Sequence, residues 1–436
     1  MTEPVHVPPG EERATRDAID PMQRRTLRVL GFAQAMSGFG LAAGITVGAL
    51  LAAELWGSTA LGGVPAVMMT LGSAGSALLI ARIANRHGRR ASLSAGYIAG
   101  ALGALGIVVG ASADVPALLI ASFVVYGGGS AANLQARFAG ADLAPPQRKA
   151  TAVSTVLVAT TLGAVLGPML ASATGGLARA IGLNPLVGPF LMAGAAYLVG
   201  GLVLSAALRP DPLLEARRRL AAEPNPAAST EASGVTPRRE HPRWRLVTGL
   251  GIGVMVAGQA VMVAIMTMTP VYMRHHGHGV GPVGIVIGLH VAAMYLPSVV
   301  AGRIIDARTP RFGTLLAAAG LALAGATAAL APGDSVPWLA VALILLGVGW
   351  SLAIVSGSTL VARAVPAHLT ATIQGRSDAI LALGGAGAAG ASGALMHAAG
   401  YGGLAWAGTA VALALVPVAV LVTRRAEGRA PTHAGD

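Results

Sequence analysis

Long apolar stretches alternate with short polar connections along most of the chain. A helix needs about 20 apolar residues to cross a bilayer, and stretches of about this length recur twelve times. The first six are expected near 27–53, 59–83, 91–111, 116–139, 150–173 and 186–208. The second six are expected near 244–272, 282–305, 314–330, 337–361, 370–396 and 404–422. The pattern predicts an all-α membrane protein with twelve transmembrane helices.

One longer polar interruption divides these helices into two groups of six. Segment 209–243 is rich in arginine and proline, too polar to order a core of its own, and reads as a flexible linker. The polar N-terminal region lacks the apolar core of a cleavable signal peptide, so helix one is expected to stay in the membrane. The predicted organisation is a cytoplasmic tail (1–26), a six-helix bundle (27–208), a cytoplasmic linker (209–243), a second bundle (244–423) and a cytoplasmic tail (424–436).

The basic residues predict the orientation in the membrane. With both termini in the cytoplasm, only Arg179 and Arg274 of the 30 lysines and arginines fall in outer loops. Arg376 is placed low in helix eleven, and the other 27 are placed in cytoplasmic tails, loops or helix ends. This is the positive-inside pattern of a multi-pass protein of the bacterial inner membrane. The net charge of +12 is therefore a topology signal, and nucleic acid is not an expected partner.

Composition narrows the function class further. Hydrophobic residues make up 54% of the chain and charged residues 11%, whereas soluble domains carry about a quarter charged residues. With no cysteine, the chain can form neither a disulfide nor a thiolate metal site. Metalloprotease, nucleophile-elbow and phosphate-loop motifs are absent, which disfavours an enzyme or an ATP-driven pump. No prosthetic cofactor is expected, and the lipid bilayer is the expected surrounding of a monomer.

An internal repeat links the two halves. Between helices two and three the chain reads ARIANRHGRR from Ala81, and between helices eight and nine it reads GRIIDARTPR from Gly302. Their offset of 221 residues is shared by Pro145 and Pro366, which follow helices four and ten. Duplicated halves are typical of carriers that hold a substrate between two bundles near the midplane.

These two decapeptides resemble the loop motif of the major facilitator superfamily, Gly-x-x-x-Asp-Arg/Lys-x-Gly-Arg-Arg/Lys. The second loop keeps the glycine and the aspartate as Gly302 and Asp306, whereas the first loop has Ala81 and Asn85 there. The first loop keeps the rest of the pattern in Arg86, Gly88, Arg89 and Arg90. The resemblance implies two pseudo-symmetric bundles that the motif latches on the cytoplasmic side. Asn85 lacks the carboxylate, which puts a charge-based latch in question for the first half.

Ionisable side chains at membrane mid-depth are the first candidates for function. Glu54 is expected near the outer end of helix one, and Asp378 near the inner end of helix eleven. His290, about eight residues inside helix eight, is the exception at mid-depth. The absence of a mid-membrane carboxylate weakens the usual proton-coupled mechanisms.

Methionines gather around this histidine. Six of the fourteen methionines lie between Met255 and Met294, and Met262 and Met266 share a stripe of helix seven. His290 and Met294 are also four residues apart, so they share a face of helix eight. At 1.5 Å per residue the two pairs lie at overlapping depths, roughly 8–18 Å from the outer helix ends. Their thioethers and imidazole would favour Cu(I) over harder cations, although methionine also fills gaps in apolar cores.

These pairs, MVAIM and HVAAM, resemble the MxxxM and HxxxM motifs of CcoA-like copper importers, a branch of the same superfamily. The resemblance implies that Met262, Met266, His290 and Met294 bind copper as the transported substrate. A sister branch of similar sequence takes up riboflavin, so the branch alone does not identify the solute.

The outer loop after helix seven offers a second group of possible ligands. It reads YMRHHGHG, so metal could be captured at the outer mouth by Met273, His275, His276 and His278, although an ordinary solvated turn is the alternative. In helix five, GAVLGP from Gly163 resembles part of a drug-antiporter motif, but tight packing or a kink explains it as well.

The sequence thus favours a copper importer that works by alternating access. A carrier for a small organic molecule, by riboflavin-type uptake or drug efflux, is the alternative, with the methionines as apolar cavity lining. A membrane metal chaperone or sensor would keep the ligands but would not need two duplicated halves.

Overall fold

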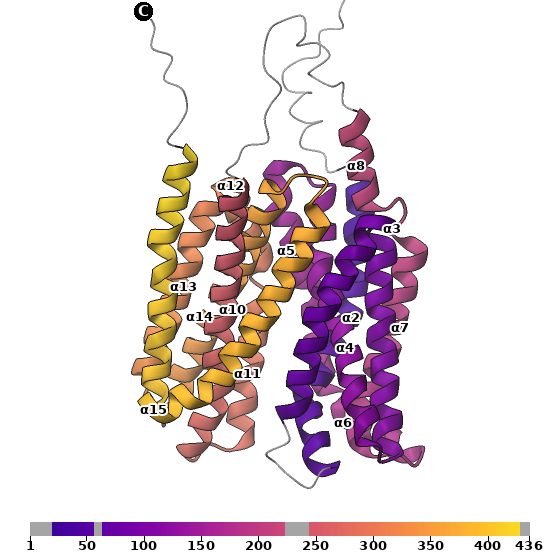
Figure 1. The fold of residues 1–436 in the computed structure, drawn as a ribbon. Coiled ribbons are helices and arrows are strands. Elements are labelled where there is room, and N and C mark those ends of the chain that lie inside the picture. The colour runs from indigo at the N-terminus through magenta and orange to yellow at the C-terminus, as the bar shows by residue number, and fades with distance from the viewer. Residues whose placement is uncertain (1–19, 56–62, 223–243, 428–436) are drawn as a thin grey trace, which may run out of the picture.

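The computed structural model describes residues 20–55, 63–222 and 244–427. These residues form helices and turns, with no strand among them. The first bundle, coloured indigo to magenta in Figure 1, contains α2 (Pro21–Leu55), α3 (Val64–Ser112), α4 (Pro116–Asp142), α5 (Lys149–Met169), α6 (Ala171–Ala180) and α7 (Gly188–Ala207). The second bundle contains α10 (Trp244–His275), α11 (Val280–Tyr295), α12 (Ser298–Ala307), α13 (Pro310–Leu330), α14 (Val336–Ala364) and α15 (Thr370–Glu427).

Two of these helices each contain two membrane passes. α3 leaves helical geometry at Gly88 (φ 83°), and α15 does so at Gly400 (φ 71°). Positive φ costs glycine little, so the chain can reverse direction at both points. In α3 the two arms lie side by side, because a Cβ on Gly128 of α4 would meet both Ser76 and Ala99.

The twelve predicted passes follow from these hairpins. Nine helical stretches in the described ranges are long and apolar enough to cross a membrane, and two of them are the hairpins. The 35 residues of α2 also exceed the length of one crossing. Two passes are interrupted: α5 continues as α6 beyond Pro168, and α11 continues as α12 beyond Pro297. Proline removes a backbone donor, which accounts for both breaks.

The predicted flexible linker differs from the structure at its beginning. Residues 212–222 form the helix α8 (Pro212–Ala222), whereas 223–243 lie outside the described residues. Asp211 caps this helix, because its Oδ1 accepts hydrogen bonds from the backbone N–H groups of Leu213 and Leu214. Leu213 is buried with Ala84 of α3 and Ala371 of α15, so α8 orders by packing on both bundles.

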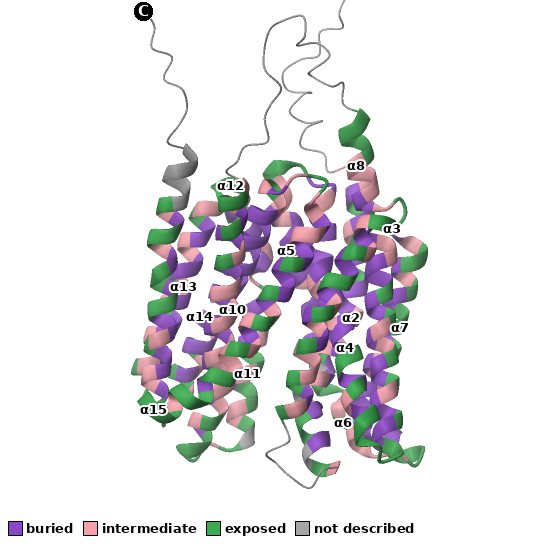
Figure 2. Ribbon diagram, in the orientation of Figure 1, coloured by how far each residue is buried: buried purple, intermediate pink, exposed green. Residues whose placement is uncertain are grey.

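Each bundle packs around its own interior, and small residues let its helices approach closely. A Cβ on Gly38 of α2 would lie 2.4 Å from the Thr160 carbonyl oxygen, and one on Gly163 would lie 2.2 Å from the Ala35 carbonyl oxygen. This contact explains the glycine of the GAVLGP segment as tight packing between α2 and α5. Large apolar side chains on the outer faces are exposed, for example Leu102 and Leu202, as expected for a surface covered by lipid (Figure 2).

The bundles meet closely at one end of the molecule, called here the latch end. The start of α2, the helix α8 and the far end of α15 lie at this end, which is uppermost in Figure 1. Between the bundles, the main packing is of α3 against α15 and of α5 against α12.

Candidate functional site

The second repeated loop joins the bundles through a helix N-terminus. Asp306 lies at the end of α12 and accepts hydrogen bonds from the backbone N–H groups of Ala150 (3.0 Å) and Thr151 (2.7 Å) in the first turn of α5. A carboxylate is stabilised there because the first N–H groups of a helix have no partners inside the helix. Gly302 permits this approach, since a Cβ there would lie 2.1 Å from the Ser154 hydroxyl oxygen. Arg363 completes the site with an ion pair of 2.9 Å to Asp306.

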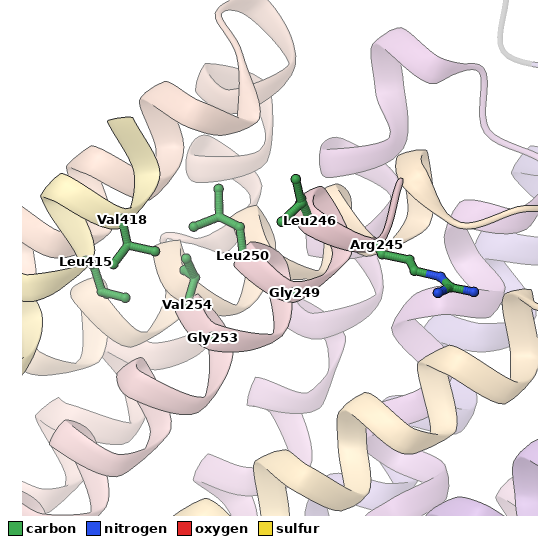
Figure 3. Close-up of a pocket in the computed structure, with 8 residues that line it drawn as sticks. All are labelled: Arg245, Leu246, Gly249, Leu250, Gly253, Val254, Leu415 and Val418. Atoms are coloured by element: carbon green, nitrogen blue, oxygen red, sulfur yellow. The ribbon is translucent and has the colours of Figure 1, made fainter. Parts of the chain in front are cut away.

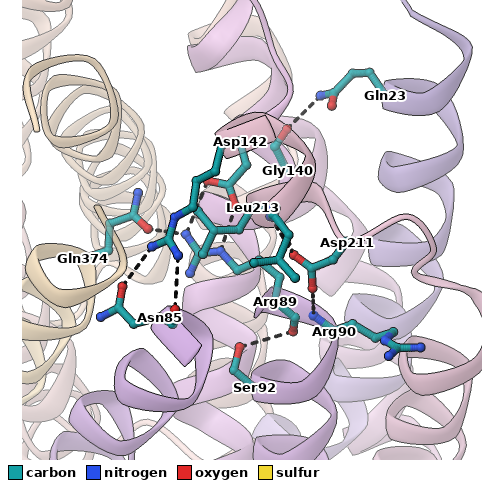
Figure 4. A network of polar contacts seen from close by, with 12 residues as sticks. Gln23, Asn85, Arg89, Arg90, Ser92, Gly140, Asp142, Asp211, Leu213 and Gln374 are labelled. Atoms are coloured by element: carbon teal, nitrogen blue, oxygen red, sulfur yellow. Dashed lines mark hydrogen bonds and ion pairs between the residues drawn. The ribbon is translucent and has the colours of Figure 1, made fainter. Parts of the chain in front are cut away.

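The first repeated loop, shown in part in Figure 4, makes a neutral version of the same contact. The Asn85 amide donates to the Thr372 hydroxyl of α15 at 2.7 Å. Ala81 packs directly on Gly375, where a Cβ would lie 2.3 Å from the Ala81 side chain. Where α3 meets α15, the glycine that allows the close approach is therefore Gly375 of α15. Where α12 meets α5, it is Gly302 of α12. The missing carboxylate does not abolish the inter-bundle contact, because an amide can still donate to a hydroxyl.

The arginines of this loop lie in different surroundings. Arg89 is fully buried, pairs with Asp142 at 2.8 Å and donates to the side-chain oxygen of Gln374 across the bundle boundary. The backbone N–H of Arg90 donates to Asp211, while Arg86 is exposed. The first loop therefore fastens α4, α15 and the segment before α8 to one another.

A buried ion pair lies deeper between the bundles. Arg137 of α4 donates from its Nη2 to the Asp378 carboxylate of α15 at 2.6 Å, and from its Nε to the Ser358 hydroxyl at 2.8 Å. Arg137 and Ser358 are separated by the repeat offset of 221 residues. Residues related by the repeat can touch only near the axis that relates the halves, so this pair lies at the centre of the interface.

This finding corrects the sequence interpretation of the charges. That interpretation places Arg137 with the basic residues at helix ends, whereas it lies inside α4 with none of its side chain exposed. The signal is present in the sequence, because an arginine within an apolar stretch is costly unless it is paired. Its partner on α15 could not be identified from hydropathy alone.

The predicted copper ligands lie in the second bundle at similar levels along α14. His290 is completely buried, and its Nδ1–H donates to the Leu343 carbonyl at 2.8 Å. Gln259 accepts a hydrogen bond from the Trp350 indole at 2.7 Å, seven residues beyond Leu343 on α14. Met266, seven residues after Gln259 on the antiparallel α10, therefore lies near the level of His290, and Met262 lies near that of Met294. The predicted overlap in depth therefore agrees with the registers of α10 and α11 on α14.

The two helices that carry these ligands were expected to be packed neighbours, but each has other main partners. α10 packs mainly on α15 and α14, whereas α11 packs mainly on α14 and reaches α5 of the first bundle. Met262 and Met294 are buried in the core, and Met266 is half-buried. No group of three or more histidine, aspartate or glutamate side chains in the described ranges could hold a metal ion. Copper binding would therefore depend on the thioethers together with His290.

The His290 ring has one nitrogen without a partner. A carbonyl oxygen can only accept, so the hydrogen bond to Leu343 places the proton on Nδ1 and leaves a lone pair on Nε2. Among the residues that the structure describes, this buried Nε2 has no hydrogen-bond partner. The ring is thus held in the tautomer in which Nε2 can bind a metal ion or accept a hydrogen bond from a solute.

The predicted outer-mouth group is only partly at the surface. Met273 is fully buried, which differs from the exposed position expected for metal capture. His276 is exposed and hydrogen-bonds to the Tyr272 carbonyl at 2.9 Å, and His278 bonds to the Gly333 carbonyl at 2.9 Å. The exposed His275 completes the group. Two of the three histidines therefore fasten the turn after α10 to neighbouring backbone.

A small polar and aromatic cluster surrounds Trp350, seven residues after Leu343 on α14. Besides its bond to Gln259, Trp350 packs edge-to-face on Tyr295 of α11 with the ring centroids 5.7 Å apart. Gln259 and Tyr295 are half-buried, and Trp350 is 4% exposed. The three side chains, called here the aromatic cluster, connect α10, α11 and α14.

One apolar groove lies elsewhere, between α10 and the second arm of α15 (Figure 3). Its volume is about 270 Å³, and its lining is apolar apart from Arg245 at one end. It contains none of the predicted substrate ligands, and its polar lining is too small to orient a polar solute. The lining residues are Arg245, Leu246, Gly249, Leu250, Gly253, Val254, Leu415 and Val418.

Comparison with known proteins identifies the family of this chain. Residues 30–389 match the family model described as Major Facilitator Superfamily. The uncharacterized MFS-type transporter YdeG of Bacillus subtilis (strain 168) is 46% identical over 399 residues, covering 92% of each chain. The riboflavin transporter RfnT of Brucella anthropi is 29% identical over 405 residues, covering 91% of this chain and 95% of its own.

A solved structure shares the fold. A bacterial homologue of the iron transporter ferroportin in the outward-facing state superposes with a TM-score of 0.67, covering 92% of this chain and all of the other at 14% identity. The twelve passes, the duplicated halves and the family match agree with one another. The chain belongs to the Major Facilitator Superfamily and is a multi-pass membrane transporter, not an enzyme.

Proposed function

We propose that this protein carries a small organic solute by alternating access, with a flavin-like heteroaromatic molecule as the first candidate. The observation that carries alternating access is the buried Arg137–Asp378 pair at the centre of the two bundles. A pair that links the bundles at one end must break when that end opens, so it distinguishes two states of the carrier. The solute class is supported by the similarity to RfnT, which extends over nearly the whole chain.

The arginine distribution assigns the latch end to the cytoplasm in this proposal. The closed latch then corresponds to a state that faces outward, and the protein lies in the inner membrane with both ends in the cytoplasm. The inter-bundle contacts of Asn85, Arg89, Arg137 and Asp306 all gather at that closed end.

The aromatic cluster has the chemistry to recognise a planar heterocycle. Aromatic side chains stack on flat rings, and the Gln259 amide can exchange hydrogen bonds with ring nitrogens and carbonyls. Trp350 holds Gln259 through the indole N–H, so the two side chains would act together.

Uptake of labelled riboflavin tests this proposal in cells that lack their own flavin uptake. Trp350→Leu and Gln259→Leu are each expected to lower uptake about tenfold, because Trp350 would lose a ring contact and Gln259 a hydrogen bond, each contributing roughly 1–1.5 kcal/mol. Trp338→Leu is the matched control, because Trp338 lies on the same helix and is 54% exposed. Uptake that does not depend on the gene would reject the flavin assignment.

Copper is the second candidate, and one observation favours it. The buried Nε2 of His290 is unpartnered among the described residues, and the pair His290/Met294 overlaps in depth with the pair Met262/Met266. A neutral imidazole and thioethers form a soft, uncharged ligand set that suits Cu(I). Copper accumulation measured in the same cells, with and without the gene, separates this candidate from the flavin carrier.

A further inference from the structure

The two repeated loops carry different charges at equivalent positions. Asn85 and Asp306 are 221 residues apart, as are their contacts Thr151 and Thr372. Asp306 binds the N-terminus of α5 as a carboxylate, and Arg363 of α14 pairs with it at 2.9 Å. Asn85 has no charge with which to bind the equivalent helix.

The partner of the first loop does not come from the equivalent helix position. The repeat counterpart of Arg363 is Asp142, which pairs with Arg89 and not with Asn85. Instead, Arg217 of α8 reaches this loop: its Nη1 donates to the Asn85 carbonyl and its Nη2 to the Asn85 Oδ1, both at 3.1 Å. Arg217 therefore occupies, at the first loop, the role that Arg363 has at the second.

Arg217 also fixes which way the Asn85 amide points. Because guanidinium groups only donate, the atom that faces Arg217 must be the amide oxygen. The NH₂ group is then directed at the Thr372 hydroxyl across the bundle boundary, where it donates at 2.7 Å. Without Arg217, the amide could rotate and the inter-bundle donor would be lost.

The helix that carries Arg217 is held in place at both of its ends. Asp211 accepts from the backbone N–H of Arg90 at 2.7 Å, and Arg219 pairs with Asp20 at 2.8 Å. Gly88 makes room for this carboxylate, because its φ is 83° and a Cβ would lie 2.3 Å from Asp211 Oδ2. The helix α8 also contacts the second bundle, because its Leu213 is buried with Ala371 of α15.

We propose that α8 is a working part of the latch and that Arg217 is its positioning residue. Arg217 orients Asn85 toward Thr372 and so stabilises the state in which the latch end is closed. The segment between the bundles thereby orients the neutral amide that stands in place of the carboxylate. This inference rests on the alternating access proposed above and does not depend on the identity of the solute.

The natural absence of cysteine allows a direct measurement of latch opening. Ser154 is completely buried where α5 meets α12, so Ser154→Cys reports exposure of that interface to a water-soluble maleimide. In purified Ser154→Cys protein, Arg217→Gln is expected to raise the labelling rate about fivefold, because the neutral hydrogen bond from Asn85 to Thr372 is lost. Arg218→Gln is the matched control, because the Arg218 side chain is 76% exposed.

A second background separates positioning from mere support of the fold. Asn85→Ala removes the amide that Arg217 orients, together with its hydrogen bond to Thr372. This change is therefore expected to speed labelling of the thiol introduced by Ser154→Cys and to shrink the effect of Arg217→Gln to less than about twofold. If α8 only supports the fold, Arg217→Gln will have the same effect in both backgrounds.

Arg137→Leu serves as the positive control, since it removes the central ion pair. Faster labelling with Arg137→Leu but not with Arg217→Gln overturns the role of α8 and leaves alternating access standing. If neither variant changes the labelling of the introduced thiol while both proteins remain folded, alternating access through this latch fails, and the proposed role of α8 fails with it.

Discussion

Arg137 and Asp378 form an ion pair of 2.6 Å that joins α4 of one bundle to α15 of the other, with 0% and 1% of their side chains exposed. The two partners differ in the contacts that each would keep within its own bundle if the bundles separated. Arg137 also donates to the Leu134 carbonyl and lies 4.3 Å from the Phe138 ring centroid, both in its own bundle. Among the described residues, Asp378 Oδ2 has no hydrogen-bond partner. Separation therefore costs the carboxylate more than the guanidinium.

This asymmetry predicts unequal effects of the two single substitutions. Arg137→Leu leaves a buried carboxylate unpaired and is expected to destabilise the closed state by about 3–5 kcal/mol. Asp378→Asn keeps a hydrogen-bond acceptor for Arg137, which retains its own-bundle contacts, so it should cost less. Thermal unfolding in detergent measures both, and the double variant Arg137→Leu/Asp378→Leu should recover most of the loss. Equal losses in the two single variants would contradict the asymmetry.

Replacement of His290 tests the unpartnered nitrogen. His290→Leu removes a buried polar atom from an apolar bundle, so stability is expected to stay equal or rise. Transport of the physiological solute should be lost if Nε2 binds it. His397→Leu is the control, because His397 is exposed on α15. Transport at the parental rate by His290→Leu would remove the histidine from the site, whichever solute is carried.

The thioethers can be removed without removing the apolar volume. The double variant Met262→Ile/Met266→Ile is expected to cost less than about 1.5 kcal/mol per site, because the replacements are of similar size. Copper accumulation should fall to the background level only if the sulfur atoms bind the metal. Met268→Ile, on the same helix, provides the comparison. Unchanged copper accumulation by the double variant would leave these methionines as core packing.

The outer histidines predict a graded effect. Changing His275, His276 and His278 to serine removes the ring contacts with the Tyr272 and Gly333 carbonyls but keeps a polar turn. If these rings concentrate metal at the mouth, the apparent affinity for copper should weaken while the maximal rate stays similar. Kinetics over a range of copper concentrations separate the two quantities. Complete loss of transport at saturating copper, with normal protein levels, would place essential ligands in this loop.

The ion pair between Arg219 and Asp20, at the C-terminal end of α8, predicts that stability depends on pH. The hydrogen bond from Arg219 lowers the pKa of Asp20 below its usual 3.8. The pair therefore contributes stability above that pH and loses it as the pH falls through the lower value in the folded protein. Both side chains are at least a third exposed, so the contribution at pH 7 should be under about 1 kcal/mol. Unfolding of Asp20→Asn and parent should differ at pH 7 and converge as the pH falls below 3.8, whereas a constant difference would assign the effect to another contact.

The sequence by itself determined the architecture. Twelve apolar stretches and a repeat offset of 221 residues predict two bundles of six helices, because only fully hydrogen-bonded helices of sufficient length can cross a bilayer. The same periodicity placed the pairs Met262/Met266 and His290/Met294 at overlapping depths, in agreement with the packing of their helices on α14. These features are local, since helix length, depth and face depend on residues close together in the chain.

Only the tertiary structure decided which distant residues meet. Hydropathy could not pair Arg137 with Asp378, 241 residues away, because the sign of a charge does not specify its partner. It also could not show that Arg217 of the predicted linker contacts Asn85, 132 residues earlier. Both contacts depend on how two bundles and a short helix pack together. The contact between the two repeated loops and the opposite bundles is therefore a property of the assembled fold, in which a helix outside both bundles donates hydrogen bonds to the asparagine that replaces the carboxylate.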